Sequence, residues 1–346
     1  MKRLAPLLLL GSALAACSGG GSDGGGTVVT PTPTPAPGTT PTPVPTSSPT
    51  PTPTGTEPAT GADFASSVAQ LYTVQPNIAG CQTGTLKPEV GARVVAVLND
   101  IRAHHNLPPV TYVSAEESAE MQSSLMMAAN GQLSHTPPTN WLCYTSAGAT
   151  AAGVSNIYLG SGGLRYSRDA DIMVGWLTDI DNIVMNNIGH RRWLLYPFLS
   201  TVSYGRVAGA YQGSFRDAAS IKVINDSQNT AGPLPDFVAY PFQDYPARYF
   251  ANGALLSFGV IANKSSNFGT NQQVSYANAT ITVTQRGGGA LAVTNIASDN
   301  QGYGLPNNLQ WNVTGLQANT IYDVTIANVN VAGNVRSYSY YFRLVP

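Results

Sequence analysis

The chain has 346 residues, of which 43% are hydrophobic and 10% are charged, with 17 basic and 18 acidic side chains. Without Lys2 and Arg3, which lie in a segment that we expect to be cleaved, 15 basic residues stand against 18 acidic ones, a net charge near −3. Nucleic-acid binding needs a basic footprint, so this balance excludes a nucleic-acid partner.

The N-terminus has the pattern of an export signal that ends at a cysteine. Two basic residues precede a short apolar run, Leu4–Leu14, which is followed by Ala15-Ala16 and Cys17. The run is too short to cross a bilayer comfortably, and small residues before the cut suit signal peptidases. This segment resembles the lipobox of bacterial lipoproteins, which implies that residues 1–16 are a signal peptide and that Cys17 carries the lipid. The alternative is an ordinary signal peptide with a chance cysteine.

The lipid on Cys17 would be the link between the mature chain and the membrane. The protein would then lie in the cell envelope, outside the cytoplasm, and Ser18 favours the outer membrane or cell surface by the same resemblance. Lipidation would also explain the odd cysteine count, because it leaves Cys81 and Cys143 as one pair. An oxidising compartment permits a disulfide between them, which we expect.

Residues 17–61 are predicted to be a linker without a fold. Ser18–Gly26 is rich in glycine and serine, and residues 27–60 form a Thr-Pro tract with little to bury. Proline-rich segments are extended, and at about 3.1 Å per residue the tract would reach on the order of 100 Å. We expect it to hold the folded part away from the membrane, although docking to a proline-binding module is an alternative.

Residues 62–232 are predicted to form one α+β domain. Apolar residues at helical spacing predict a helix over 91–105, and a capping-box pattern at Ser114–Glu117 opens a second helix with Met121, Leu125 and Ala128 on its buried face. A third helix is expected from about Asp169 to Asn186. Strand-like runs follow at 193–195, 202–207 and 220–224. Helices followed by strands on one core suggest a sandwich.

Residues 233–346 are predicted to form a small all-β sandwich. Six strand-like runs are separated by turn residues, at 254–261, 279–285, 291–296, 309–313, 322–327 and 337–344. The segment Leu316–Tyr322 resembles the tyrosine-corner segment of immunoglobulin-like and fibronectin type III domains. That resemblance implies an Ig-like domain.

The chain has four histidines, and two of them stand out. His104 and His105 lie near a predicted helix end, where we expect a solvated terminus that the helix dipole favours. His135 and His190 each follow a predicted helix, so both can face one end of a sandwich. Asp179 lies on or beside the expected buried stripe of the third helix, which is Ile172, Trp176, Ile180 and Ile183. A carboxylate there is unfavourable unless it is paired or functional, the alternative being an exposed edge position.

Five short motifs in order resemble the CAP superfamily, also called SCP-like or cysteine-rich secretory, antigen 5 and pathogenesis-related-1 proteins. The motifs are Leu98–Arg102, Leu133–His135, Ser155–Ile157, Trp176–Asp179 and Gly189–Trp193. The resemblance covers about residues 90–224. It implies an α-β-α sandwich with a large cleft, which often holds two histidines and two acidic residues, and whose histidine pair can bind a divalent metal.

Carried over by position, His135 and His190 match the two histidines of the family, and Asp179 matches the acidic residue of its W-x-x-E pattern. The family's other glutamate stands before asparagine in G-E-N, and here Ser155 takes that place before Asn156. Two imidazoles alone do not complete a tight zinc site, which usually has three or four protein ligands. With Ser155 at this position, the chain has no carboxylate there that could act as the general base in place of the family's glutamate.

Three functions stay open, because fold alone does not choose among them. The first is a non-enzymatic module that binds a small lipid or sterol-like ligand, or a partner, in the cleft of His135, Ser155, Asn156, Asp179 and His190. The second is a metal-dependent hydrolase or peptidase, with zinc or another divalent metal at the two histidines and Asp179 as the base. The third is a cell-surface interaction protein that acts through its β-sandwich. Since Ser155 replaces the glutamate, we favour the first and assign no catalytic residue.

Overall fold

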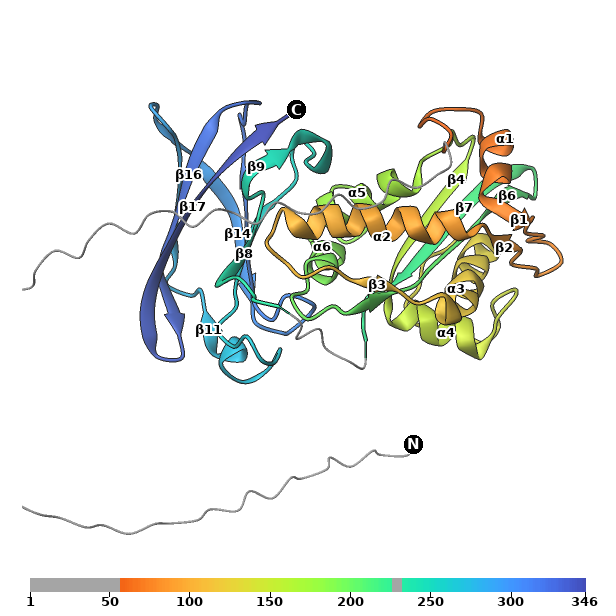
Figure 1. Ribbon diagram of the computed structural model, residues 1–346, viewed down its shortest axis with the longest axis horizontal. Helices are drawn as coiled ribbons and strands as arrows, with labels where there is room; N and C mark the ends of the chain where they lie inside the picture. Colours follow the sequence, from red (N-terminus) through yellow and green to blue (C-terminus); the bar gives the residue numbers. More distant parts are fainter. Residues whose placement is uncertain (1–56, 226–231) are drawn as a thin grey trace, which may run out of the picture. The chain divides into compact units, whose positions relative to one another are not determined.

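The computed structural model describes residues 57–225 and 232–346, which belong to one compact unit (Figure 1). The expected signal peptide, Cys17 and nearly all of the linker lie outside the described residues, so their assignments stay predictions. Among the described helices none is long and apolar enough to cross a membrane. The predicted domain boundary at 232/233 lies beside the undescribed residues 226–231 and is not tested.

The N-terminal part is an α+β sandwich around a three-stranded antiparallel sheet with strand order β4–β7–β6. Its strands are β4 (Ser155–Gly162), β6 (Tyr204–Tyr211) and β7 (Ser214–Lys222). Its described α-helices are α1 (Phe64–Val68), α2 (Pro88–Ala103), α3 (Glu117–Asn130), α4 (Ser146–Gly153), α5 (Asp169–Thr178) and α6 (Gly189–Leu194). Two short pairs complete it, β1 (Tyr72–Val74) with β2 (Thr85–Leu86) and β3 (Thr111–Tyr112) with β5 (Thr201–Val202). The expected fold class is confirmed.

Helices cover both faces of this sheet. On one face α3 packs against β6 and β7, and α4 packs against α3. On the other face the buried Arg206 of β6 pairs with Asp169 at the start of α5, at 2.9 Å, and with Asp217 of β7, at 2.7 Å. Arg93 of α2 reaches the same Asp169 at 3.1 Å. The three layers are therefore α3/α4, the sheet, and α5/α2.

The first two predicted helices are present with small changes at their ends. Apolar residues at helical spacing are buried in both, so the periodicity located them correctly. The capping box expected at Ser114 is wrong. Ser114–Glu116 forms a 3-10 turn, and α3 starts at Glu117 without a side-chain cap. The helix ends at Gly131, which adopts the left-handed conformation (φ 62°) that glycine allows at low cost.

The third predicted helix is shorter than expected. Asp179 adopts a left-handed conformation (φ 52°) that ends α5 at Thr178, instead of at Asn186. Ile180 and Ile183 are consequently 47% and 80% exposed, and the predicted buried stripe ends at Trp176. The strand expected at 193–195 is also wrong, because the chain forms α6 there.

The C-terminal part is all β, as predicted. One sheet has the order β14–β15–β10–β8, and the other has β13–β12–β16–β17–β9 with β11 paired to β16. The strands are β8 (Phe237–Tyr240), β9 (Gln243–Pro246), β10 (Leu256–Val260), β11 (Val274–Ser275), β12 (Thr280–Gln285), β13 (Ala290–Leu291), β14 (Val293–Asp299), β15 (Asn308–Val313), β16 (Ile321–Val331) and β17 (Asn334–Val345). Buried residues of both sheets form a shared core around Phe258, Trp311 and Phe342.

Two smaller features test particular predictions. Cys81 and Cys143 form the expected disulfide, with their Cα atoms 5.2 Å apart. Tyr322 is buried, and its hydroxyl accepts a hydrogen bond from the backbone N–H of Gln317 at 2.8 Å, as in a tyrosine corner. The Ig-like assignment itself stays a prediction.

The solvated position expected for His105 is wrong. The side chain is 2% exposed, and its Nδ1 donates to the carbonyl of Ala239 at 2.8 Å. Its Nε2 lies 3.1 Å from the hydroxyl of Tyr245. Burial lowers the pKa of His105 to about 3, so the ring is neutral near pH 7. This histidine joins the end of α2 to β8 and β9.

Candidate functional site

A cavity of about 970 Å³ brings the predicted cleft residues together. Its wall contains all five of them, His135, Ser155, Asn156, Asp179 and His190. They come from the loop after α3, the start of β4, the end of α5 and the start of α6. Segments far apart in the sequence therefore meet at one place, as the resemblance implied.

Asp179 and His190 form a close pair at this cavity. The Asp179 side chain is buried, and its Oδ1 accepts a hydrogen bond from Nδ1 of His190 at 2.6 Å. Its Oδ2 accepts the backbone N–H of Arg191 at 3.0 Å. The left-handed turn that ends α5 points the carboxylate toward the first turn of α6. Because the carboxylate occupies Nδ1, the imidazole has its acceptor lone pair on Nε2 when it is neutral.

His135 is oriented in the same way by a different partner. Its Nδ1 donates to the backbone carbonyl of Ala152 in α4 at 2.8 Å. A carbonyl only accepts, so the proton of the neutral ring is on Nδ1 and the lone pair is on Nε2. Among the described residues, no hydrogen bond reaches Nε2 of His135 or His190. The cavity wall therefore holds two imidazoles whose orientation is fixed through Nδ1.

Ser155 and Asn156 point to opposite faces of β4, as neighbours on a strand do. The Ser155 hydroxyl donates to Oε2 of Glu120 in α3 at 2.9 Å, so its side chain is directed at the helix layer. Asn156 donates from Nδ2 to the backbone carbonyl of His190 at 3.1 Å. Asn156 thus supports the start of α6, while Ser155 connects the cleft wall to a buried acid.

Glu120 is the buried carboxyl that the sequence interpretation missed. It is 1% exposed, and Oε2 also accepts a hydrogen bond from the hydroxyl of Ser220 in β7. Burial raises the pKa of Glu120 to about 7, and the two serine hydroxyls oppose that rise. Its place directly before Met121, beside the apolar stripe of α3, is the same kind of signal that singled out Asp179.

The carboxylates do not complete a metal site with the histidines. Among the described residues, no three His, Cys, Asp or Glu side chains are grouped so that they could hold one ion. Both Asp179 oxygens already accept hydrogen bonds, and the position of the family's second acid holds Ser155. Two imidazoles alone do not fit a tight zinc site. The expected divalent metal stays a prediction, and no step is derived through it.

The C-terminal β region supplies a part of the cavity wall that no sequence motif indicated. Its residues there are Ala297, Ser298, Asp299, Tyr303, Asn308 and Gln310. They come from β14, β15 and the segment between them. The sequence interpretation placed the cleft wholly within residues 62–232.

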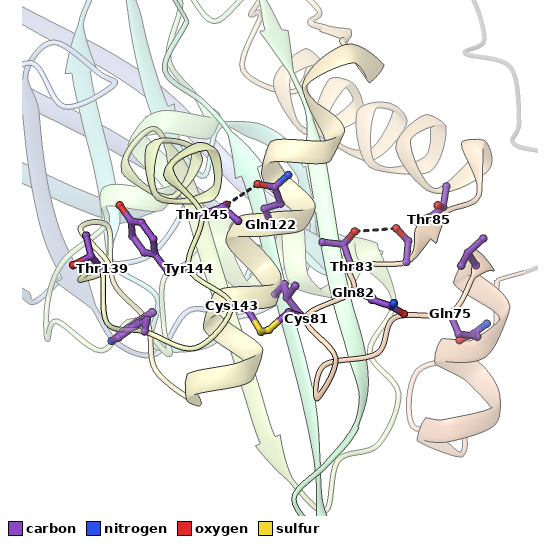
Figure 2. A pocket seen from close by; sticks show the side chains of 14 residues that line it. Gln75, Cys81, Gln82, Thr83, Thr85, Gln122, Thr139, Cys143, Tyr144 and Thr145 are labelled. Atoms are coloured by element: carbon purple, nitrogen blue, oxygen red, sulfur yellow. Dashed lines mark hydrogen bonds between the residues drawn. A yellow bond between two sulfur atoms is a disulfide. The ribbon is translucent and has the colours of Figure 1, made fainter.

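A second cavity of about 960 Å³ lies beside the disulfide, where Figure 2 shows Cys81 and Cys143 among largely polar side chains. Thr145 donates to Oε1 of Gln122 at 2.6 Å on its wall, an interaction also drawn in Figure 2. The wall of this second cavity contains none of the predicted cleft residues. The two orientated histidines therefore mark the first cavity as the candidate site.

A protein-family model matches the part of the chain that contains these residues. The CAP family model, described as the cysteine-rich secretory protein family, matches residues 95–217, which include all five cleft residues. No curated protein matches the chain. Among solved structures, an extracellular protein containing an SCP domain from Bacillus anthracis is similar, with 20% identity and a TM-score of 0.24. That similarity covers 39% of this chain and 44% of the other, so the chain matches less than half of that protein's length. The chain therefore contains a domain of the CAP, or cysteine-rich secretory protein, family at residues 95–217.

Proposed function

We propose that this chain is a lipid-anchored protein of the cell envelope whose CAP-domain cleft binds a small amphipathic ligand of lipid or sterol type. The observation that carries the proposal is the cavity of about 970 Å³ with its two orientated imidazoles. Ligand sites in proteins are commonly cavities of this size, apolar with a few placed polar groups. The cavity can hold a molecule with an apolar body and a hydrogen-bonding end.

The lining matches such a ligand. Apolar side chains from several elements contribute to it, namely Leu133, Ile157, Leu159, Ile172, Trp176, Ile188, Trp193 and Val223. Nε2 of His135 and His190 can accept a hydrogen bond from a ligand hydroxyl. Burying the apolar body would stabilise the complex by roughly 25 cal/mol for each Å² removed from water.

The arrangement favours binding over hydrolysis. A general base has to have a lone pair directed at the reacting proton. Asp179 uses both oxygens for His190 and the backbone of Arg191, and the Ser155 hydroxyl is directed at Glu120. Neither side chain is therefore free to attack a substrate, and a base for hydrolysis would have to be Nε2 of His135 or His190. Zinc-dependent hydrolysis and a role for the β-sandwich in cell-surface interactions remain the alternatives to test.

The anchor belongs to the proposal as well. The lipobox-like segment ending at Cys17 would place the protein outside the cytoplasm on a membrane. Since the lipid on Cys17 would already attach the chain, a lipid in the cleft would be cargo or signal and would not be the means of attachment.

The test is an equilibrium titration of the chain carrying Cys17→Ser with the fluorescent sterol dehydroergosterol. Trp176 and Trp193 line the cavity, so energy transfer from tryptophan to the bound probe reports occupancy. We expect saturable binding that weakens about tenfold in the combined variant His135→Ala and His190→Ala. The control is His104→Ala, which changes a histidine outside the cavity. The proposal would be overturned if the parent chain showed no saturable binding, or if the combined His135 and His190 variant bound the probe as tightly as the parent chain and the His104→Ala control.

A further inference from the structure

The cavity that contains His135 and His190 has two walls, and the C-terminal β region makes the second. Three of its residues lie at the end of β14 (Ala297, Ser298 and Asp299), two lie in β15 (Asn308 and Gln310), and Tyr303 lies between these strands. The two strands are paired side by side, with Ser298 opposite Leu309 and Asp299 opposite Asn308. Residues paired across the ladder share a face, so Ala297 and Asp299 lie on the same face as Asn308 and Gln310. Ser298 is on the face of the buried Leu309, and Tyr303 lies outside the ladder.

This wall is fixed to the helix that carries His190. Arg192 of α6 donates to both carboxylate oxygens of Asp299, at 2.8 and 3.0 Å, and to the carbonyl of Leu305 at 3.1 Å. The buried Arg191 donates to the carbonyl of Leu255, at 2.6 Å, and to the hydroxyl of Ser257 at 3.2 Å. A two-pronged arginine–carboxylate contact sets orientation as well as distance. Arg192 thus fixes the end of β14 to α6, and Arg191 fixes the start of β10 to the same helix.

Apart from Ala297, the side chains of the second wall are polar, whereas the CAP-domain wall mixes apolar side chains with polar and charged ones. Gln310 donates from Nε2 to the backbone carbonyl of Asn186 at 2.6 Å, and its Oε1 accepts from Nδ2 of Asn308 at 2.9 Å. Because the backbone carbonyl of Asn186 can only accept, these two consecutive hydrogen bonds fix which end of each side-chain amide is the oxygen. They leave Oδ1 of the buried Asn308 without a hydrogen-bond partner among the described residues. A buried acceptor without a partner is unfavourable, and a donor next to it removes that cost.

The backbone of β14 also has a feature that is common beside binding sites. The register with β15 shifts between Thr294 and Ala297, which marks a bulge, and Asn295 is in a left-handed conformation (φ 51°). Bulges redirect the side chains that follow them. Ala297 and Ser298 come directly after this one and line the cavity. At the rim, Tyr303 is 56% exposed, and its ring lies 5.9 Å from the guanidinium carbon of Arg192.

We propose that the C-terminal β region is the second half of the ligand site, in which the wall of β14 and β15 binds the hydroxyl- or amide-bearing end of the ligand together with Nε2 of His135 and His190. The apolar body of the ligand then lies against the apolar side chains of the CAP-domain wall, such as Trp176 and Trp193. This inference rests on the proposed function, because it concerns the same cavity. It makes Tyr303, Asn308 and Gln310 residues that determine which ligand is accepted.

The first test measures whether a bound probe covers both walls. Single cysteines are placed in the chain carrying Cys17→Ser, by Ser134→Cys on the CAP wall and by Ala297→Cys, an exposed position, on the second wall, and their reaction rates with a maleimide are compared. The control is Thr282→Cys, an exposed position on β12 outside the cavity. We expect dehydroergosterol to slow labelling at least fivefold at 134 and 297 and not at 282. Protection at 134 alone would overturn the two-walled site and leave the proposed function standing. Absence of any binding would overturn the proposed function itself.

The second test measures selectivity, which a purely structural role would not change. Cholesterol and cholestane, which lacks the hydroxyl, compete with the bound probe. The parent chain should prefer cholesterol by at least fivefold, and the variant Tyr303→Phe should keep at most half of that preference while it still binds the probe. Tyr303 is exposed, and the change removes only its hydroxyl group. An unchanged preference would overturn the role of the second wall.

Discussion

The buried carboxyl of Glu120 should make the protein more stable at pH 4.5 than at pH 8, and Glu120→Gln should remove that part of the pH dependence. The side chain lies between α3 and the sheet, where it accepts hydrogen bonds from Ser155 and Ser220. Burial raises its pKa from 4.5 to about 7. Between these two values the folded chain holds a proton that the unfolded chain has released. Rising pH therefore lowers the free energy of unfolding across this window.

The magnitude follows from the two pKa values. Each pH unit between them is equivalent to about 1.4 kcal/mol, so the full effect of moving from 4.5 to about 7 is about 3 kcal/mol. Glutamine keeps an oxygen that can accept both serine hydroxyls, and it does not ionise. The free energy of unfolding of Glu120→Gln, taken relative to that of the parent chain, should therefore be about 3 kcal/mol higher at pH 8 than at pH 4.5.

The assay is urea denaturation followed by tryptophan fluorescence at pH 4.5, 6 and 8. Taking the difference between variant and parent cancels the contributions of the other titrating groups. The matched control is Ser123→Ala, which changes a buried serine on the same helix whose hydroxyl has no partner among the described residues. A difference between Glu120→Gln and the parent that stays constant from pH 4.5 to pH 8 would refute the reasoning.

Three further predictions concern the disulfide between Cys81 and Cys143, the pair of Asp179 and His190, and the buried His105. Cys81→Ser with Cys143→Ser should lower the free energy of unfolding by about 4 kcal/mol, because the bond joins residues 62 positions apart; a loss below about 1 kcal/mol in urea denaturation would contradict this. Asp179→Asn should weaken sterol binding, by less than the tenfold expected when both rings are removed, because His190 loses the carboxylate that orients it; unchanged affinity in the titration would count against the pair. Burial lowers the pKa of His105 to about 3, so the unfolded chain takes up a proton below about pH 6.5 that the folded chain does not, and stability falls as the pH drops. His105→Gln should flatten that fall in acid denaturation, and parallel curves would argue against it.

The residues of the CAP-domain wall could be predicted because each belongs to a short motif at the end of a local element. His135 and His190 follow helices, and Asp179 was recognised as a carboxylate beside an apolar stripe. The predicted buried stripe was too long, because the apolar pattern continues through Ile180 and Ile183 although the helix ends before Asp179. A left-handed aspartate that is stabilised by contacts with α6 leaves no periodic signal in the sequence.

The second wall could not be predicted from local patterns. Gln310 and Asn308 lie in a strand that any β-sandwich could contain, and their role depends on Asn186, more than 100 residues earlier. Glu120 was missed although its place beside the apolar stripe of α3 is a local signal, because nothing local indicates its partners. Its partners Ser155 and Ser220 come from two different strands, so its burial is set by the packing of α3 on the sheet.

The central claim, that two imidazoles fixed through Nδ1 face one ligand cavity, is tested most directly by long-range ¹H–¹⁵N correlation spectra of the chain carrying Cys17→Ser and labelled at histidine. With only four histidines, every ring can be assigned by single substitutions. At a pH where the rings are neutral, His135 and His190 should each carry the proton on Nδ1. Addition of dehydroergosterol should shift the Nε2 signals of these two rings and leave the buried His105 unchanged. Protons on Nε2 in the free chain, or a saturating ligand that moves neither ring, would contradict the account.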